Sequence, residues 1–118
     1  MWLSDNIITG TITSQIRLLT NLASISIADS SLIGFIPTEF GILTGLRRLW
    51  LSSNQLIGEI PSELGHLKEL DTLELHDNNI SGTMPREICE TVFSSNYELR
   101  SLTTDCSLVS CRCCTECL

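Results

Sequence analysis

The stretch Leu46-Arg-Arg-Leu-Trp-Leu-Ser-Ser-Asn-Gln-Leu-Ile-Gly-Glu-Ile-Pro-Ser-Glu-Leu-Gly-His-Leu67 is the most regular part of the chain, and its spacing recurs along the sequence. Within it, Leu49 and Leu51 flank Trp50, an alternation of period two that is typical of a short strand with one buried face. A leucine or isoleucine recurs at one constant interval in the column Leu3, Ile27, Leu51, Leu75 and Leu99. A fixed period of this length predicts a solenoid of stacked coils.

Other columns keep the same offset and have distinct roles in each coil. Asparagines at the inward turn can pair neighbouring backbone groups on both sides, so we expect Asn6, Asn54 and Asn78 to form a structural ladder. Ser30 replaces the ladder asparagine in one coil, where we expect a weaker seam because a hydroxyl satisfies fewer groups. A glycine column, which suits positive φ or tight packing, comprises Gly10, Gly34, Gly58 and Gly82.

The quoted stretch resembles the LxxLxLxxNxLxGxIPxxLGxL pattern of plant-type leucine-rich repeats. The resemblance covers roughly residues 1–90, about four coils of which the first is truncated. It implies an α/β solenoid, a right-handed coil with a parallel β-sheet on its concave face and short strands at the Gly-x-Ile-Pro segments. Residues 91–118 are expected to form the last strand, in register at Leu99, followed by a cysteine-rich C-terminal cap.

All the cysteines lie at or after position 89, and we expect them to form disulfides that staple the cap. They are Cys89, Cys106, Cys111, Cys113, Cys114 and Cys117. Cys89 is placed to tie the cap to the coils, but the sequence leaves the pairing open. The alternative is a structural zinc site at the last four, although this cluster is too compressed for easy tetrahedral geometry. The spacing of the tail is similar to the ends of leucine-rich-repeat proteins in diatoms and related algae.

Composition excludes several classes of partner. The formal net charge is −7, so the basic surface that nucleic acids require is absent. No apolar run is long enough to span a bilayer, so we expect no membrane insertion by this segment, and we expect no cofactor and no metal. Asn79-Ile80-Ser81 is a glycosylation sequon, and with the cysteines it favours an extracellular or cell-surface location.

The solvent-facing strand positions form the candidate ligand-binding face, because the repeat does not dictate their residue types. We expect Trp50 beside Arg48 to be its anchor, since exposed Trp and Arg are typical of interfaces, whereas Trp2 could simply be an end residue. Acidic positions next to arginines make a mixed field that could equally be a solvated surface. The complete candidate set is Trp2, Arg48, Trp50, Ser52, Thr72, Glu74, His76, Asp77, Glu98 and Arg100.

These observations favour recognition of a protein, peptide or glycan. The face measures only about 250 Å² at a strand spacing of about 4.8 Å, against about 800 Å² per partner in a standard interface. We therefore expect the C-terminal part of a larger receptor-like or inhibitor-like protein, and the start inside a strand agrees with this. The alternative is a structural secreted or matrix protein without a discrete ligand. Ser52 and His76, with Asp29 and Asp77 nearby, superficially suggest a hydrolase, but we expect no enzyme because no pocket or oxyanion donor is evident. The mixed columns also argue against ice binding.

Overall fold

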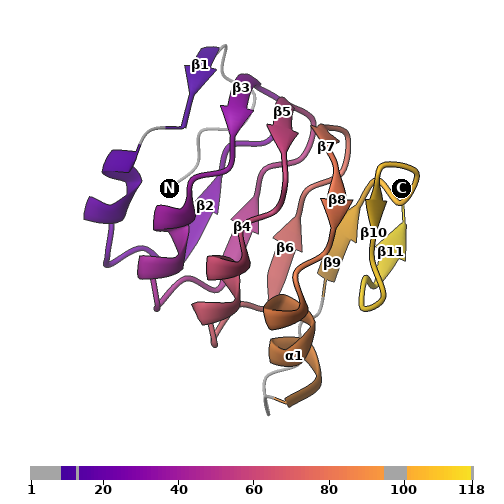
Figure 1. Ribbon diagram of the computed structural model, residues 1–118. Helices are drawn as coiled ribbons and strands as arrows, with labels where there is room; N and C mark the ends of the chain where they lie inside the picture. Colours follow the sequence, from indigo (N-terminus) through magenta and orange to yellow (C-terminus); the bar gives the residue numbers. More distant parts are fainter. Residues whose placement is uncertain (1–8, 13, 95–100, 118) are drawn as a thin grey trace.

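The computed structural model describes residues 9–12, 14–94 and 101–117. A complete coil consists of a strand, a second strand and a short 3-10 helix, as in β4 (Arg48–Trp50), β5 (Gln55–Gly58) and η3 (Ser62–His66) (Figure 1). The elements before it are β1 (Thr9–Thr11), η1 (Ser14–Leu18), β2 (Ser24–Ser26), β3 (Ser31–Phe35) and η2 (Thr38–Ile42). The solenoid of stacked coils that the period predicted is confirmed.

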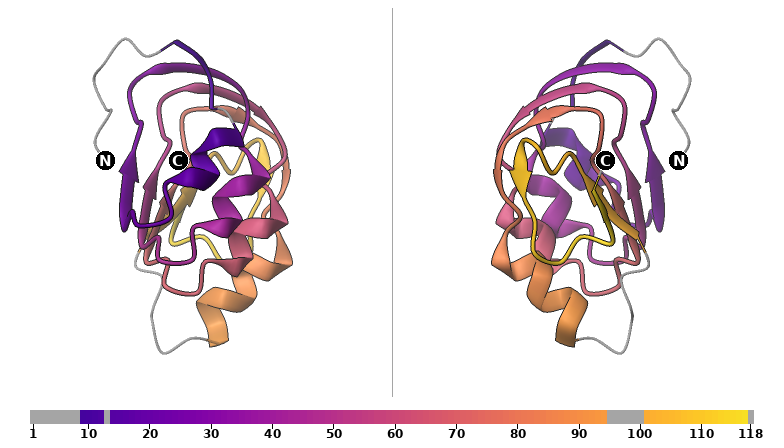
Figure 2. Two further views of the ribbon diagram at one scale, coloured as in Figure 1. Left: turned by 90° about the vertical axis from the view of Figure 1, so that its left-hand side faces the viewer. Right: turned by 90° about the vertical axis from the view of Figure 1, so that its right-hand side faces the viewer.

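The last coil and the cap supply the remaining elements. The coil contains β6 (Thr72–Glu74), β7 (Asn79–Ile80), β8 (Gly82–Thr83) and α1 (Arg86–Ser94). The cap contains β9 (Ser101–Thr104), β10 (Val109–Ser110) and β11 (Glu116–Cys117). Figure 2, which looks along the stack, shows the coils lying one behind another. The 3-10 helices and α1 lie on a different side of each coil from the strands β2, β4 and β6.

The first strand of each coil belongs to one parallel sheet with the order β2-β4-β6-β9-β11, which we call the major sheet. Ile25 lies opposite Leu49, and Leu49 lies opposite Leu73, so neighbouring strands of the coils are in register at the sequence period. All three side chains are completely buried, as the alternation of period two predicted.

The second strands form another parallel sheet with the order β1-β3-β5-β7, which we call the minor sheet. The resemblance placed its short strands at the Gly-x-Ile-Pro segments. The strands in fact begin earlier, and β5 ends at Gly58 while β3 ends one residue beyond Gly34. After β3 and β5, Ile36-Pro37 and Ile60-Pro61 lead into the 3-10 helices η2 and η3, because proline supplies an extended residue without an N–H donor.

The core of the coils is a column of leucine and isoleucine side chains, joined by Phe40 and Met84. Asn54 seals the turn beside this core: its Nδ2 donates to the carbonyls of Ile27 (2.7 Å) and Leu51 (3.1 Å), and its Oδ1 accepts from the N–H of Leu32 (3.2 Å). Asn78 repeats the arrangement with Leu51, Leu75 and Leu56 in the next coil. The predicted ladder is confirmed at these two positions, whereas Asn6 lies outside the described residues.

The glycine column meets both expected demands, positive φ and close packing. Gly58 has φ +82°, and a Cβ added there would collide with the ring of Phe35 from the preceding coil. Gly34 and Gly82 likewise have positive φ and lie against side chains of Thr11 and Glu59. The side chains of Thr11, Phe35 and Glu59, which follow Gly10, Gly34 and Gly58, therefore lie against the next glycine toward the C-terminal end.

The register of the last strand differs from the prediction. Leu102 lies opposite Leu73, whereas the constant interval of the repeat placed Tyr97 there. The last coil is longer than the others, because α1 is an α-helix of nine residues at the place where the coils have five-residue 3-10 helices. Leu99 itself lies outside the described residues.

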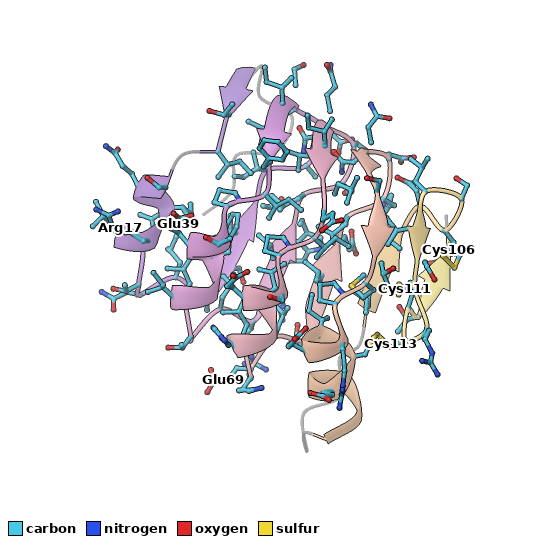
Figure 3. All side chains as sticks on the ribbon, viewed as in Figure 1. Arg17, Glu39, Glu69, Cys106, Cys111 and Cys113 are labelled. Atoms are coloured by element: carbon cyan, nitrogen blue, oxygen red, sulfur yellow. A yellow bond between two sulfur atoms is a disulfide. The ribbon has the colours of Figure 1, made fainter. Side chains whose placement is uncertain are left out.

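The cap extends both sides of the last coil by parallel pairing. β11 pairs with β9 of the major sheet, and β10 pairs with β8, with Val109 opposite Gly82. Disulfides join Cys89 in α1 to Cys113, Cys106 to Cys117, and Cys111 to Cys114. Figure 3 shows Cys106, Cys111 and Cys113 at the C-terminal end of the stack. The predicted disulfide-rich cap is confirmed, and Cys89 ties it to the coils.

Candidate binding face

The exposed side of the major sheet brings four of the candidate residues into two adjacent rows. Arg48 lies opposite Thr72, and two residues along the strands Trp50 lies opposite Glu74. The buried Leu49 and Leu73 lie between the rows, so the four side chains project to the side away from the core. The rows that the sequence predicted therefore exist on β4 and β6.

The candidate residues on β4, on β6 and just after β4 differ in how much of each side chain is exposed to solvent. Arg48 is exposed and Trp50, Thr72 and Glu74 are half-buried. Ser52, by contrast, is only 6% exposed, so its side chain offers little surface to a partner. The useful surface therefore consists of the four positions on β4 and β6, and it does not extend to Ser52.

Asp71, which was not among the predicted site residues, holds the end of the face nearest Arg48. Asp71 Oδ2 lies 3.5 Å from Arg47 Nη2, and Asp71 Oδ1 lies 3.8 Å from Arg48 Nε. Thr72 Oγ1 donates to the same Oδ1 at 3.0 Å. The Asp71 side chain is 11% exposed while both arginine side chains are about half exposed. Asp71 thus anchors two guanidinium groups that still face solvent.

The spacing of the sequence could have revealed Asp71. It lies one full repeat after Arg47 and one position before the strand β6, so the repeat already placed the two residues side by side on neighbouring coils. Asp71 was not predicted, because it is not one of the solvent-facing strand positions. The sequence placed Arg48 in a mixed field with Glu74, Asp77 and Glu98, and among the described residues Arg48 forms an ion pair with Asp71.

The other end of the face is held by the cap strand. His76 Nδ1 lies 2.7 Å from Thr103 Oγ1, and Thr103 is buried. Asp77 has φ +55°, the left-handed region that aspartate tolerates, and its carboxylate accepts a long hydrogen bond of 3.5 Å from Ser53 Oγ. The His76 ring therefore makes a hydrogen bond to the cap strand β9.

Asp105 ends the ladder of backbone hydrogen bonds at this edge. In the coil before, Ser53 N–H and Asn54 N–H donate to the backbone carbonyls of His76 and Asp77. In the last coil, the N–H groups of Asp77 and Asn78 donate instead to the two carboxylate oxygens of Asp105, each at 3.0 Å. The Asp105 carboxylate thus takes the place of the two backbone carbonyls that the next coil supplies elsewhere in the stack.

The last strand changes the membership of the candidate set. Thr103 lies opposite Glu74, in the position that the repeat predicted for Glu98. That assignment was wrong because of the longer last coil. Glu98, Arg100 and Trp2 themselves lie outside the described residues.

Three further features lie away from this face. Asn79 of the sequon is exposed in the minor sheet. A cavity of about 460 Å³ lies between α1 and the cap, lined by Thr83, Met84, Arg86, Cys89, Glu90 and Arg112. Within residues 9–12, 14–94 and 101–117, no helix has the length and apolar character needed to cross a bilayer.

The comparisons with known proteins agree with this geometry. The model of the family described as Leucine Rich Repeat matches residues 45–67 and 69–91. No curated protein matches the sequence. Among solved structures, a chain of the BIR3–SERK2 complex from Arabidopsis thaliana is similar at 27% sequence identity and a TM-score of 0.79, covering 94% of this chain and 56% of that chain.

Two further structures from the same plant are similar. The complex of the receptor kinase HAESA with the peptide hormone IDA and the co-receptor SERK1 matches at 34% identity and a TM-score of 0.79, covering 94% of this chain and 17% of that chain. The ectodomain of the receptor kinase GASSHO1/SCHENGEN3 with CASPARIAN STRIP INTEGRITY FACTOR 2 matches at 41% identity and a TM-score of 0.75, covering 77% and 11%. The chain thus spans between 11% and 56% of the length of these proteins.

Proposed function

Because the chain is a leucine-rich-repeat protein whose coils end in a disulfide-bonded cap, we propose that it is an extracellular recognition module. It binds a protein or peptide partner through the exposed face of the major sheet, and it acts by binding and not by catalysis. The similar structures are described as complexes with a peptide hormone, a co-receptor and CASPARIAN STRIP INTEGRITY FACTOR 2, which supports this class of partner.

The observation that carries the proposal is the pair of rows in which Arg48 and Trp50 face Thr72 and Glu74. Arg48 contributes an exposed guanidinium that Asp71 orients from below, so part of its conformational entropy is already lost before a partner binds. Trp50 contributes a large amphipathic side chain next to it. An arginine and a tryptophan on a flat sheet are the residue types that most often dominate binding energy.

An extracellular setting is supported by the cap. All six cysteines are paired, and disulfides of this density persist in oxidising compartments. The candidate face is smaller than the area of about 800 Å² that a standard interface requires of each partner. We therefore propose that it works together with further surface, as part of a larger receptor-like or inhibitor-like protein.

The experiment is a capture assay with the disulfide-bonded chain and the proteins and peptides that its source cells secrete. The variants Arg48→Ala and Trp50→Ala are compared with Gln55→Ala, which removes an exposed side chain from the minor sheet. We expect Trp50→Ala to weaken capture of a specific partner at least about tenfold, as hot-spot truncation does, while Gln55→Ala leaves it unchanged. A glycan array run in parallel identifies a carbohydrate ligand.

If every captured partner binds the two face variants as well as it binds the native chain, the assignment of function to the major sheet must be abandoned. If nothing binds the native chain and the glycan array is blank, recognition by this chain is contradicted, and the alternative of a structural secreted protein gains support. Circular dichroism of each variant establishes that a loss of binding does not reflect unfolding.

A further inference from the structure

The exposed side of the minor sheet carries three large apolar side chains in adjacent positions. Ile33 is 48%, Phe35 66% and Ile57 44% exposed. Phe35 lies directly opposite Ile57 across β3 and β5, and Ile33 is two residues from Phe35 on the same side of β3. We call these three residues the apolar patch. A cluster of this kind in a protein of net charge −7 calls for a covering group.

Asn79 continues one row of this patch. The register pairs Phe35 with Ile57 and Ile57 with Asn79, so the three side chains lie side by side on β3, β5 and β7. Strands are about 4.8 Å apart, which places Asn79 about 10 Å from the Phe35 backbone. The Phe35 ring leans over Gly58 on the middle strand, and this brings it closer to Asn79.

The local structure presents the Asn79 amide to solvent. Asn79 is exposed, and the next residue, Ile80, is buried and fixes β7 to the core. Ser81 N–H donates to the carbonyl of Gly58 at 2.9 Å, which holds the end of the sequon against β5. The Asn79 side chain therefore projects on the same side of the sheet as Ile57 and Phe35.

We propose that Asn79 carries an N-linked glycan whose first two N-acetylglucosamine units lie across Ile57 and Phe35 and cover the apolar patch. Export through the secretory pathway, which the proposal shares with the extracellular function above, supplies the lipid-pyrophosphate-linked oligosaccharide. Asn79 Nδ2 forms a bond to C1 of the first sugar, the bond from C1 to the phosphate oxygen breaks, the lipid pyrophosphate leaves, and Nδ2 loses one proton.

The apolar patch and the first N-acetylglucosamine units have complementary surfaces. One face of an N-acetylglucosamine ring presents only C–H groups, which stack on an aromatic face, and its acetamido methyl group is apolar. The Phe35 ring lies against Gly58 and is still 66% exposed, so ring surface remains available to a sugar. A sugar unit is about as long as the spacing between two strands, so two units starting at Asn79 reach Phe35.

The test expresses the full chain behind a signal peptide in a eukaryotic host and measures occupancy of Asn79 by mass spectrometry of the intact glycopeptide. Native chain, Ser81→Ala, Phe35→Ser and Ile42→Ser are compared. Ser81→Ala removes the sequon but keeps Asn79, and Ile42→Ser is the matched control because Ile42 is 55% exposed on η2, away from the patch. We expect Asn79 to be occupied in all variants except Ser81→Ala.

Two measurements then locate the sugar. Proton NMR of the native glycoprotein should show protons of the first two sugars shifted upfield by the Phe35 ring, and Phe35→Ser should abolish the shift while Ile42→Ser retains it. Binding of the dye ANS should rise in Ser81→Ala, because the apolar patch is uncovered.

Absence of a glycan at Asn79 in the native chain would overturn the proposal, and so would sugar protons with identical shifts in native chain and Phe35→Ser. Self-association of the native glycoprotein through the patch would also overturn it, because a second copy would then be the covering group. None of these outcomes touches Trp50 or Arg48, so capture of a partner by Ser81→Ala distinguishes failure of this proposal from failure of the proposed function.

Discussion

The coils and the cap continue the same sheets with different chemistry. In the coils, each strand pairs with its equivalent in the next coil, leucine and isoleucine fill most core positions, and Asn54 and Asn78 seal two of the turns. In the cap, β9 and β11 continue the major sheet, and disulfides and the Asp105 carboxylate hold the chain in place. Each coil is thus stabilised by the coils on either side of it, whereas the end of the stack must be closed by groups that do not depend on another coil.

The largest effect should come from removing the link between the two regions. The Cys89–Cys113 disulfide spans 24 residues and joins α1 to the cap. The double variant Cys89→Ser with Cys113→Ser should lower the free energy of unfolding by about 3.5 kcal/mol, since the closed loop restricts the unfolded chain. Guanidinium unfolding followed by circular dichroism measures it.

The matched control is the double variant Cys111→Ser with Cys114→Ser, whose disulfide spans only 3 residues. Its loss should cost about 2 kcal/mol, because a short loop restricts the unfolded chain less. An equal loss in the two double variants would show that the link between cap and coils has no special role in stability.

Within the coils, the seam at Asn54 should be next in size. Asn54→Ala leaves the buried N–H of Leu32 and the carbonyl of Ile27 without their side-chain partner, so we expect a loss of about 2.5 kcal/mol. Asn54→Ser, which copies the residue at position 30, should lose less because its hydroxyl retains part of the bonding. Urea unfolding of the two variants gives the values; a serine variant as unstable as alanine would contradict the role assigned to hydrogen bonding.

In the cap, Asp105 performs the task that backbone carbonyls perform in the coils. Asp105→Ala should lower the free energy of unfolding by about 1.5 kcal/mol, because two backbone N–H groups lose a charged acceptor. Hydrogen exchange should accelerate at Asp77 and Asn78 but not at Ser53 and Asn54, whose acceptors are carbonyls. Acceleration at all four amides would mean that the carboxylate acts on the whole sheet and not at its edge.

The sequence predicted the coils well because a repeat states the same physical requirement several times. The columns that contain Leu49, Leu73, Asn54 and Gly58 each recur, so the buried face, the ladder and the turn could be assigned by comparison within the chain. The cap has no second copy. The helix α1 lengthened the last coil before β9, and this shifted the register that Leu99 was expected to keep.

The disulfide pairing and the contacts at the edge of the cap could not be predicted by comparing the repeats with one another. Which cysteines meet depends on how the loop after β9 folds back to β8 and α1, and spacing alone does not determine that path. Asp105 was unremarked because its role exists only where a coil is missing. On the candidate face, the rows of Arg48 and Trp50 were predicted. Asp71 was not, although it lies one repeat after Arg47, because it precedes its strand and is not a solvent-facing strand position.

The smallest effect on stability should come from Asp71, and it bears directly on the proposed face. Asp71→Asn removes the charge that holds Arg47 and Arg48, but both arginine side chains are about half exposed, so solvent screening limits the loss to about 0.5 kcal/mol. Binding should respond more than stability, because a released Arg48 must be ordered again by the partner. Calorimetry of a captured partner with Asp71→Asn and with Glu69→Gln, an exposed acid two residues away, separates the two effects. Weaker binding in Asp71→Asn alone, with nearly native unfolding, would show that the coils use this carboxylate to prepare a surface and not to hold the fold. Equal binding by both variants would show that Arg48 needs no such preparation.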